Sequence, residues 1–135
     1  MPSASWSLQQ AVFATLAADA PLSALLGEDR ILDDVPQGTL PPYVTFGPIT
    51  ARDWSTSTET GTEHVLTLHV WSSGHGKKEA HAMIAAIVAA LHDQPLTLTG
   101  HRLINLRHEL SEVRRYGDGH TVHATVRFRA VTEPA

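Results

Sequence analysis

The spacing of hydrophobic positions changes within residues 63–91, and this change predicts a strand followed by a helix. Over residues 64–71 apolar and polar side chains alternate, with Leu66, Leu68 and Val70 on one side. This alternation is typical of a strand with one face in a core. Further on, apolar residues recur every three or four positions, at Ala80, Met83, Ile84, Ile87, Val88 and Leu91. Such a stripe predicts a helix that packs on the apolar face of a sheet.

Two helices are predicted before this unit. Leu8, Val12 and Leu16 recur at helical spacing, and Phe13 is expected to widen their apolar stripe. A short second helix is predicted from Pro21 to Leu26, because proline favours the first helical position and a glycine follows the last one.

Four extended segments complete the pattern. Residues 43–50 are predicted to form a strand that is an edge or carries a bulge, because it contains Pro48. After the long helix, a short strand is expected near residues 96–98. A longer strand is then predicted from Arg102, and a return strand ending at Ala130 follows a glycine-rich turn. In the strand after Arg102, three apolar residues are assigned to one side: Ile104, Leu106 and Leu110.

Together these elements predict one α+β domain over residues 1–135. We expect a mainly antiparallel sheet of about four or five strands, built from two long hairpins. The long helix and the N-terminal helix should pack on one face of this sheet. Residues 132–135 are expected to be a loose C-terminus.

The polar segment 51–62 admits two interpretations. One is a solvated hairpin tip between the strands at 43–50 and 63–71. The other is a mobile arm that carries Trp54 to a partner. Neither is preferred from the sequence, because a lone tryptophan in a polar stretch usually finds some cover.

Composition excludes several classes of protein. The chain has 135 residues, a formal net charge of −4 and no cysteine, so there is no disulfide framework, thiolate metal site or cysteine nucleophile. No apolar run reaches the length that spans a bilayer, and no signal peptide is recognised. With only 10 Lys and Arg, tight nucleic-acid binding is not expected.

Nine histidines raise the possibility of a metal site, but their spacing does not support one. No HExxH motif occurs, His75 and His81 flank a helix start, and His64 and His69 are expected on opposite faces of a strand. Scattered surface histidines are the favoured interpretation. No serine lies in a G-x-S-x-G motif, so no catalytic residue, metal ligand or cofactor-binding residue is assigned.

The glycine-bearing segment 72–78 follows a strand and opens a helix, which is where a phosphate-binding loop would lie. Trp71 occupies the position where the Walker motif needs its first glycine. An ordinary strand-to-helix turn is therefore favoured.

Three blocks of sequence, taken in order, resemble a known family. They are Val35-Pro36-Gln37-Gly38 with Pro42-Tyr43-Val44-Thr45-Phe46-Gly47, His69-Val70-Trp71-Ser72 with Lys77-Lys78-Glu79-Ala80, and Asp118-Gly119 with Val126-Arg127-Phe128-Arg129-Ala130. In this order the chain is similar to the tail-completion, or tail-terminator, proteins of long-tailed phages and phage-like gene transfer agents.

The resemblance implies a structural virion protein rather than an enzyme, made in the host cytoplasm and located at the head-proximal end of the tail. Such proteins form a ring, commonly a hexamer, that ends tail-tube polymerisation and meets the head–tail connector or neck protein. DNA would pass through the lumen without specific binding, and no cofactor or membrane is implied.

A ring requires two different patches on each subunit. Strand edges and charged side chains are the candidates for these patches. The residues assigned to a subunit or partner interface are Arg52, Asp53, Trp54, Glu59, Glu63, Arg114, Arg115, Arg127 and Arg129.

Two alternatives stay open at this point. One is a head–tail connector or neck subunit, which does the same class of work at a neighbouring position. The other is a small metal- or ligand-binding α+β protein, suggested by the histidines and by segment 72–78.

Overall fold

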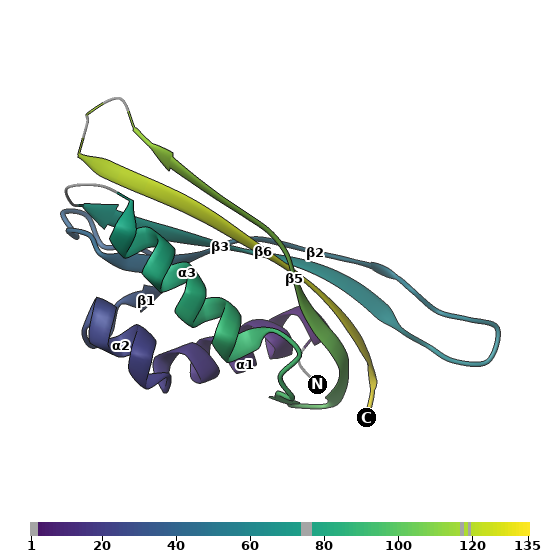
Figure 1. The fold of residues 1–135 in the computed structure, drawn as a ribbon. Coiled ribbons are helices and arrows are strands. Elements are labelled where there is room, and N and C mark those ends of the chain that lie inside the picture. The colour runs from purple at the N-terminus through teal and green to yellow at the C-terminus, as the bar shows by residue number, and fades with distance from the viewer. Residues whose placement is uncertain (1–2, 74–76, 117, 119) are drawn as a thin grey trace.

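A computed structural model gives the fold, and it describes residues 3–73, 77–116, 118 and 120–135. Three helices and six strands follow one another along the chain (Figure 1). In chain order they are α1 (Ala4–Ala17), α2 (Ala20–Leu26), β1 (Ile31–Leu32), β2 (Tyr43–Asp53), β3 (Thr62–Ser73), α3 (Lys78–Leu91), β4 (Thr97–Leu98), β5 (His101–Arg115) and β6 (Thr121–Pro134).

The six strands form one sheet in the order β1-β2-β3-β6-β5-β4. All neighbouring strands are antiparallel except β1 and β2, which are parallel. Two long hairpins, β2–β3 and β5–β6, supply most of the sheet and meet along β3 and β6. The predicted α+β class and the two hairpins are confirmed. The sheet has six strands where about four or five were expected. Strands β1 and β4 are two residues long each, and β4 is the short strand expected near residues 96–98.

The three helices cover one face of the sheet, and the other face carries no helix among the described residues (Figure 1). The core lies between them. From α3 it takes Met83, Ile87 and Leu91, and from β3 it takes Leu66 and Leu68, all with no exposed surface. The predicted helical stripe and the predicted alternation of β3 therefore meet in one core, which hydrophobic burial stabilises.

The first helix exposes a residue that the sequence pattern placed toward the core. Leu8, Val12 and Leu16 are fully buried, as predicted. Phe13 is 45% exposed, so it does not widen the buried stripe. It follows Val12 by one position, and neighbouring positions on a helix do not share a face.

The predicted facing of β5 is wrong for two of its three apolar residues. Leu106 is buried, but Ile104 and Leu110 are 50% and 43% exposed. The register between β5 and β6 shifts between Leu103 and Asn105, and again between His108 and Leu110. Each irregularity of this kind inserts a residue, so an alternation counted along the sequence loses phase with the pleat.

The C-terminus differs from the expected loose end. Strand β6 continues to Pro134, Thr132 is buried, and Glu133 forms an ion pair with Arg102 at 3.1 Å. Pairing with β5 reaches Pro134 opposite His101. Residues 132–134 therefore belong to the sheet.

Candidate assembly surfaces

The β2–β3 hairpin reaches beyond the body of the sheet and forms an arm (Figure 1). Strand β2 ends at Asp53 and β3 begins at Thr62, and residues 51–60 are exposed throughout. The predicted hairpin is confirmed. Its distal part has little side-chain burial of its own, so its shape depends on local hydrogen bonds.

Those hydrogen bonds are numerous at the arm tip. The Asp53 carboxylate accepts from the Ser55 hydroxyl at 2.6 Å and from the Ser55 backbone N–H at 3.2 Å. The pKa of Asp53 lies below its usual value because of these bonds from Ser55. The Gly61 N–H donates to Ser55 Oγ, and the Glu59 N–H donates to Thr56 Oγ1. The turn is thus fixed by residues that favour turns.

Charged residues surround Trp54 at the base of the tip. Its indole is 48% exposed, and the guanidinium carbons of Arg129 and Arg52 lie 5.1 Å and 5.9 Å from the ring centroid. Glu63 joins both arginines, at 2.6 Å to Arg129 Nε and 3.3 Å to Arg52 Nε. We call Arg52, Trp54, Glu63 and Arg129 the arm cluster. Four of the nine predicted interface residues are therefore brought together within one subunit.

The other five predicted interface residues do not belong to the arm cluster. Glu59 and Asp53 are on the exposed arm, while Arg114 and Arg115 end β5 near the second hairpin turn. Arg127 lies on the helix-free face and pairs with Glu109 at 3.3 Å. Arg114 pairs with Glu112 of its own strand. These arginines have intrachain partners, except Arg115, for which the described chain shows none.

Aromatic rings cover the helix-free face of the sheet near β3 and β6. Trp71 stacks on His123 with a centroid distance of 4.3 Å, and Tyr43 and Tyr116 lie 6.2 Å and 5.6 Å from Trp71. His69 Nδ1 is 2.8 Å from His123 Nε2. Burial lowers the pKa of both imidazoles. These side chains cover one another, so this part of the sheet needs no second layer.

One histidine is part of the core, contrary to the prediction of surface histidines. His64 has no exposed surface. Its Nε2 is 2.9 Å from Thr132 Oγ1 on β6, and its Nδ1 is 3.2 Å from Ser5 Oγ on α1. Both nitrogens are satisfied, and burial lowers the pKa of the ring. A structural role fits this environment, because the imidazole joins three elements.

A metal site finds no support in the described residues. In that part of the chain, no group of three or more His, Asp or Glu side chains could hold a metal ion. His75 and the centre of the possible phosphate loop, residues 74–76, lie outside the described residues. No described helix is long and apolar enough to cross a membrane.

Two sheet edges are open to another chain. Strand β1 covers only Val44 and Thr45 of β2, which leaves the outer edge of β2 free from Phe46 to Asp53 within the described structure. On the opposite side, the loop after α3 covers β5 through two hydrogen bonds, from Asp93 N to Leu106 O and from His108 N to His92 Nδ1. Beyond them, residues 109–115 have no outer strand neighbour among the described residues.

Comparison with known proteins gives one family and two informative structures. Residues 10–133 match the family model described as Tail completion protein gp17. A chain in the structure of the virion of a native gene transfer agent particle is 34% identical, with a TM-score of 0.87. That alignment covers 98% of this chain and 99% of the other.

The second structure is the bacteriophage SPP1 gp17 protein. It is 24% identical, with a TM-score of 0.62, over 94% of this chain and 89% of that one. At this identity the likeness shows the fold alone. No curated protein matches the chain.

Proposed function

This chain belongs to the tail completion protein gp17 family and so has a structural role in the tail of a phage-like particle, where we propose that it forms the ring that caps the tail tube. In this role the ring ends tube polymerisation and joins the tail to the head connector. A central channel lets DNA pass without specific binding, and no catalytic step is involved. Six subunits are the expected number.

The pair of open strand edges is the observation that supports this proposal best. Unpaired backbone groups on a sheet edge can pair with another chain. Here the free edges, Phe46–Asp53 of β2 and residues 109–115 of β5, lie on opposite sides of the sheet. Contact between unlike patches is heterologous, and a heterologous contact closes into a ring when the rotation between subunits allows it.

The direction of the backbone groups identifies the residues that would pair. The Trp54 N–H donates to Gly61 O within the hairpin, so the alternate residues Ala51 and Asp53 direct their N–H and C=O outward. On β5 the Tyr116 N–H donates to Thr121 O of the β6 side, so Val113 and Arg115 are the outward residues. Both edges offer backbone groups at the same two-residue spacing.

The arm and its charged residues are the second part of the proposed interface. Asp53, Trp54 and Glu59 are exposed on the arm, whereas Glu63 and Arg129 neutralise each other at its base. We assign Asp53, Glu59 and the exposed part of Trp54 to contact with a neighbouring subunit. The ion pairs that Glu63 makes with Arg52 and Arg129 are assigned to fixing the direction of the arm. Arg114 and Arg115 flank the edge of β5 and would meet the arm of the next subunit.

A single substitution on the β2 edge tests ring formation. Ala51→Pro removes an outward N–H that the β2–β3 ladder does not use, and proline is tolerated on strand edges. We expect the melting temperature of the monomer to change little, while light scattering and negative-stain images show loss of rings and of tube capping. Ala51→Ser retains the N–H and is the matched control, which should assemble as the parent does.

Removal of the arm tip gives an independent test. Deleting residues 55–60 should leave monomer stability nearly unchanged, because these residues are exposed, yet abolish assembly. Rings and capped tubes formed by the deleted protein would contradict the assignment of the arm. Binding to head connectors with no binding to tail tubes would instead favour a neck subunit.

A further inference from the structure

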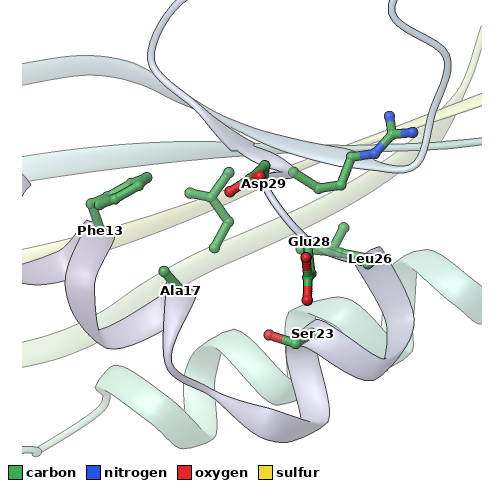
Figure 2. A pocket seen from close by; sticks show the side chains of 9 residues that line it. Phe13, Ala17, Ser23, Leu26, Glu28 and Asp29 are labelled. Carbon is green, nitrogen blue, oxygen red and sulfur yellow. The ribbon is translucent and has the colours of Figure 1, made fainter.

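Two hollows flank Phe13 of α1, and both include its side chain in their lining. The larger, of about 360 Å³, lies between α1 and β2. It is lined by Trp6, Gln9, Gln10, Phe13, Asp33 and Phe46. The smaller, of about 180 Å³, lies on the other side of Phe13 against α2 and the start of β1. In Figure 2 the Phe13 ring stands at one end of this hollow, and Ser23 and Glu28 stand at the other. We call the two hollows the α1 groove.

The helix leaves aromatic area uncovered along this groove. Trp6 and Phe13 are seven positions apart, which places them on one face of α1, and they are 48% and 45% exposed. A neighbouring face of α1 is already buried in the core through Leu8, Val12 and Leu16. Contiguous exposed apolar surface of this kind marks a site of interaction in many soluble proteins.

The net charge of the protein is concentrated in residues 19–34, some of which line the groove. Residues 19–34 contain five of the 14 carboxylate side chains but only one of the 10 Lys and Arg side chains. The rest of the chain therefore has nine side chains of each charge. Glu28, Asp29, Asp33 and Asp34 are exposed, and three of them line a hollow. The single cation in this segment, Arg30, donates to the Leu40 backbone oxygen at 2.8 Å.

We propose that the α1 groove receives a segment of another protein of the particle, one that carries apolar side chains flanked by Lys or Arg. Apolar side chains would fill the hollows beside Trp6 and Phe13, and the flanking cations would meet the acidic rim. This inference rests on the proposed function, because the expected partner is a protein that lies next to the proposed ring in the particle. Charge complementarity at a rim of this kind selects the partner and speeds association.

A second copy of this chain fits the groove less well. Six of its arginines already have a carboxylate partner: Arg52, Arg102, Arg107, Arg114, Arg127 and Arg129. Outside the groove, the cations left without a carboxylate within the described chain are Lys77, Lys78 and Arg115. The outward residues proposed for ring formation, Ala51 and Asp53 on β2 and Val113 and Arg115 on β5, do not line either hollow.

Binding of rings to tail tubes and to tailless heads tests the proposal, with both taken from particles that lack this chain. Asp33→Asn with Asp34→Asn removes one charge that lines the larger hollow and the exposed charge next to it in sequence. The amide oxygen introduced at position 33 can still accept from Gln9. We expect rings to form and affinity for one of the two partners to fall about fivefold at low salt, with a smaller effect at high salt. Phe13→Gln should lower the same affinity about tenfold, as loss of an aromatic anchor does.

Two controls match these variants. Asp93→Asn with Glu133→Gln removes the same net charge from positions outside the groove and outside both ring edges. Ile104→Thr removes an equally exposed apolar side chain. Both should bind tubes and heads as the parent does. Equal loss in the controls, or full binding of the groove variants to both partners, would refute the proposal. If only the groove variants fail to form rings, the groove is occupied by a second copy of this chain, and the proposal is wrong in that case too.

The outcome for the parent protein separates the two proposals. If the parent binds neither tubes nor heads, the proposed capping function fails and this inference fails with it. If the parent caps tubes and the groove variants match it at every step, only the α1 groove assignment fails.

Discussion

His69 and His123 face each other across the central pair of strands. The Nδ1 atom of His69 lies 2.8 Å from the Nε2 atom of His123, and the ring centroids are 4.9 Å apart. One ring donates and the other accepts, so the contact requires at least one neutral imidazole. Arg114 and Glu112 on β5 are the charged residues that act on His123.

Stability should therefore depend on pH in the range where histidine titrates. Burial lowers the pKa of His64, His69 and His123. A lowered pKa means that the unfolded chain binds more protons than the folded one below about pH 6.5. We expect the free energy of unfolding to be nearly constant from about pH 8 to pH 7 and to fall from about pH 6.5 to pH 5. Urea unfolding at each pH measures it.

A substitution at His123 should identify the source of this dependence. His123→Gln removes one of the three groups and should flatten the decrease between about pH 6.5 and pH 5. Substitution of the exposed His120 should leave the slope unchanged, and an equal effect of the two variants would contradict the assignment.

Gly47 lies close enough to the His69 ring to exclude a side chain at position 47. A Cβ atom at Gly47 would lie 2.6 Å from His69 Nε2 and 3.3 Å from the Thr67 oxygen. Gly47→Ala should therefore displace the His69 ring from His123 and cost about 1–3 kcal/mol of unfolding free energy, as overpacking does. In a His69→Ala background the same change should cost much less. Equal costs in both backgrounds would show that the clash lies elsewhere.

The ion pair in the arm cluster should be stronger than an ordinary surface pair. Arg129 and Glu63 are 27% and 12% exposed, and Arg129 also lies over Trp54. A double-mutant cycle with Arg129→Ala and Glu63→Ala should give a coupling of about 1 kcal/mol. The exposed pair Arg114 and Glu112 is the control, with a coupling near zero. Comparable couplings for both pairs would contradict a special role for the arm cluster.

The contact between α3 and the sheet should be sensitive to loss of volume. Ile87 is fully buried in the core, so Ile87→Ala should cost about 2–5 kcal/mol through lost transfer energy and a residual cavity. Chemical denaturation measures the change. Ala89→Ser, on the exposed side of the same helix, is the control and should have a far smaller effect.

The sequence predicted those parts of the fold in which the periodic pattern is uninterrupted. Helix α3 and strand β3 keep one period from end to end, and both are found as expected. Strand β5 was misjudged because two irregularities interrupt its alternation, and nothing in the spacing of Ile104 and Leu110 reveals them. His64 had a usable signal, since it is in phase with Leu66 and Leu68 on the buried side of β3.

The arm was predictable and its charged partners were not. A polar segment between two strands indicates a hairpin, which locates Trp54 and Glu59 near its tip. The pairing of Glu63 with Arg129 joins residues 66 positions apart and depends on the register between β3 and β6. The α1 groove was missed because Phe13 was assigned to the buried stripe.

The pairing of β3 with β6, which joins the two hairpins, should slow the folding of the subunit. Each hairpin forms from neighbouring residues, but β3 and β6 join partners such as His64 and Thr132, which are 68 positions apart. The chain must lose the entropy of closing this large loop before the contacts between β3 and β6 can compensate for it. Folding of the subunit should accordingly take milliseconds to seconds rather than microseconds. During that interval both hairpins expose strand edges, so newly made chains are most prone to mispairing at this stage.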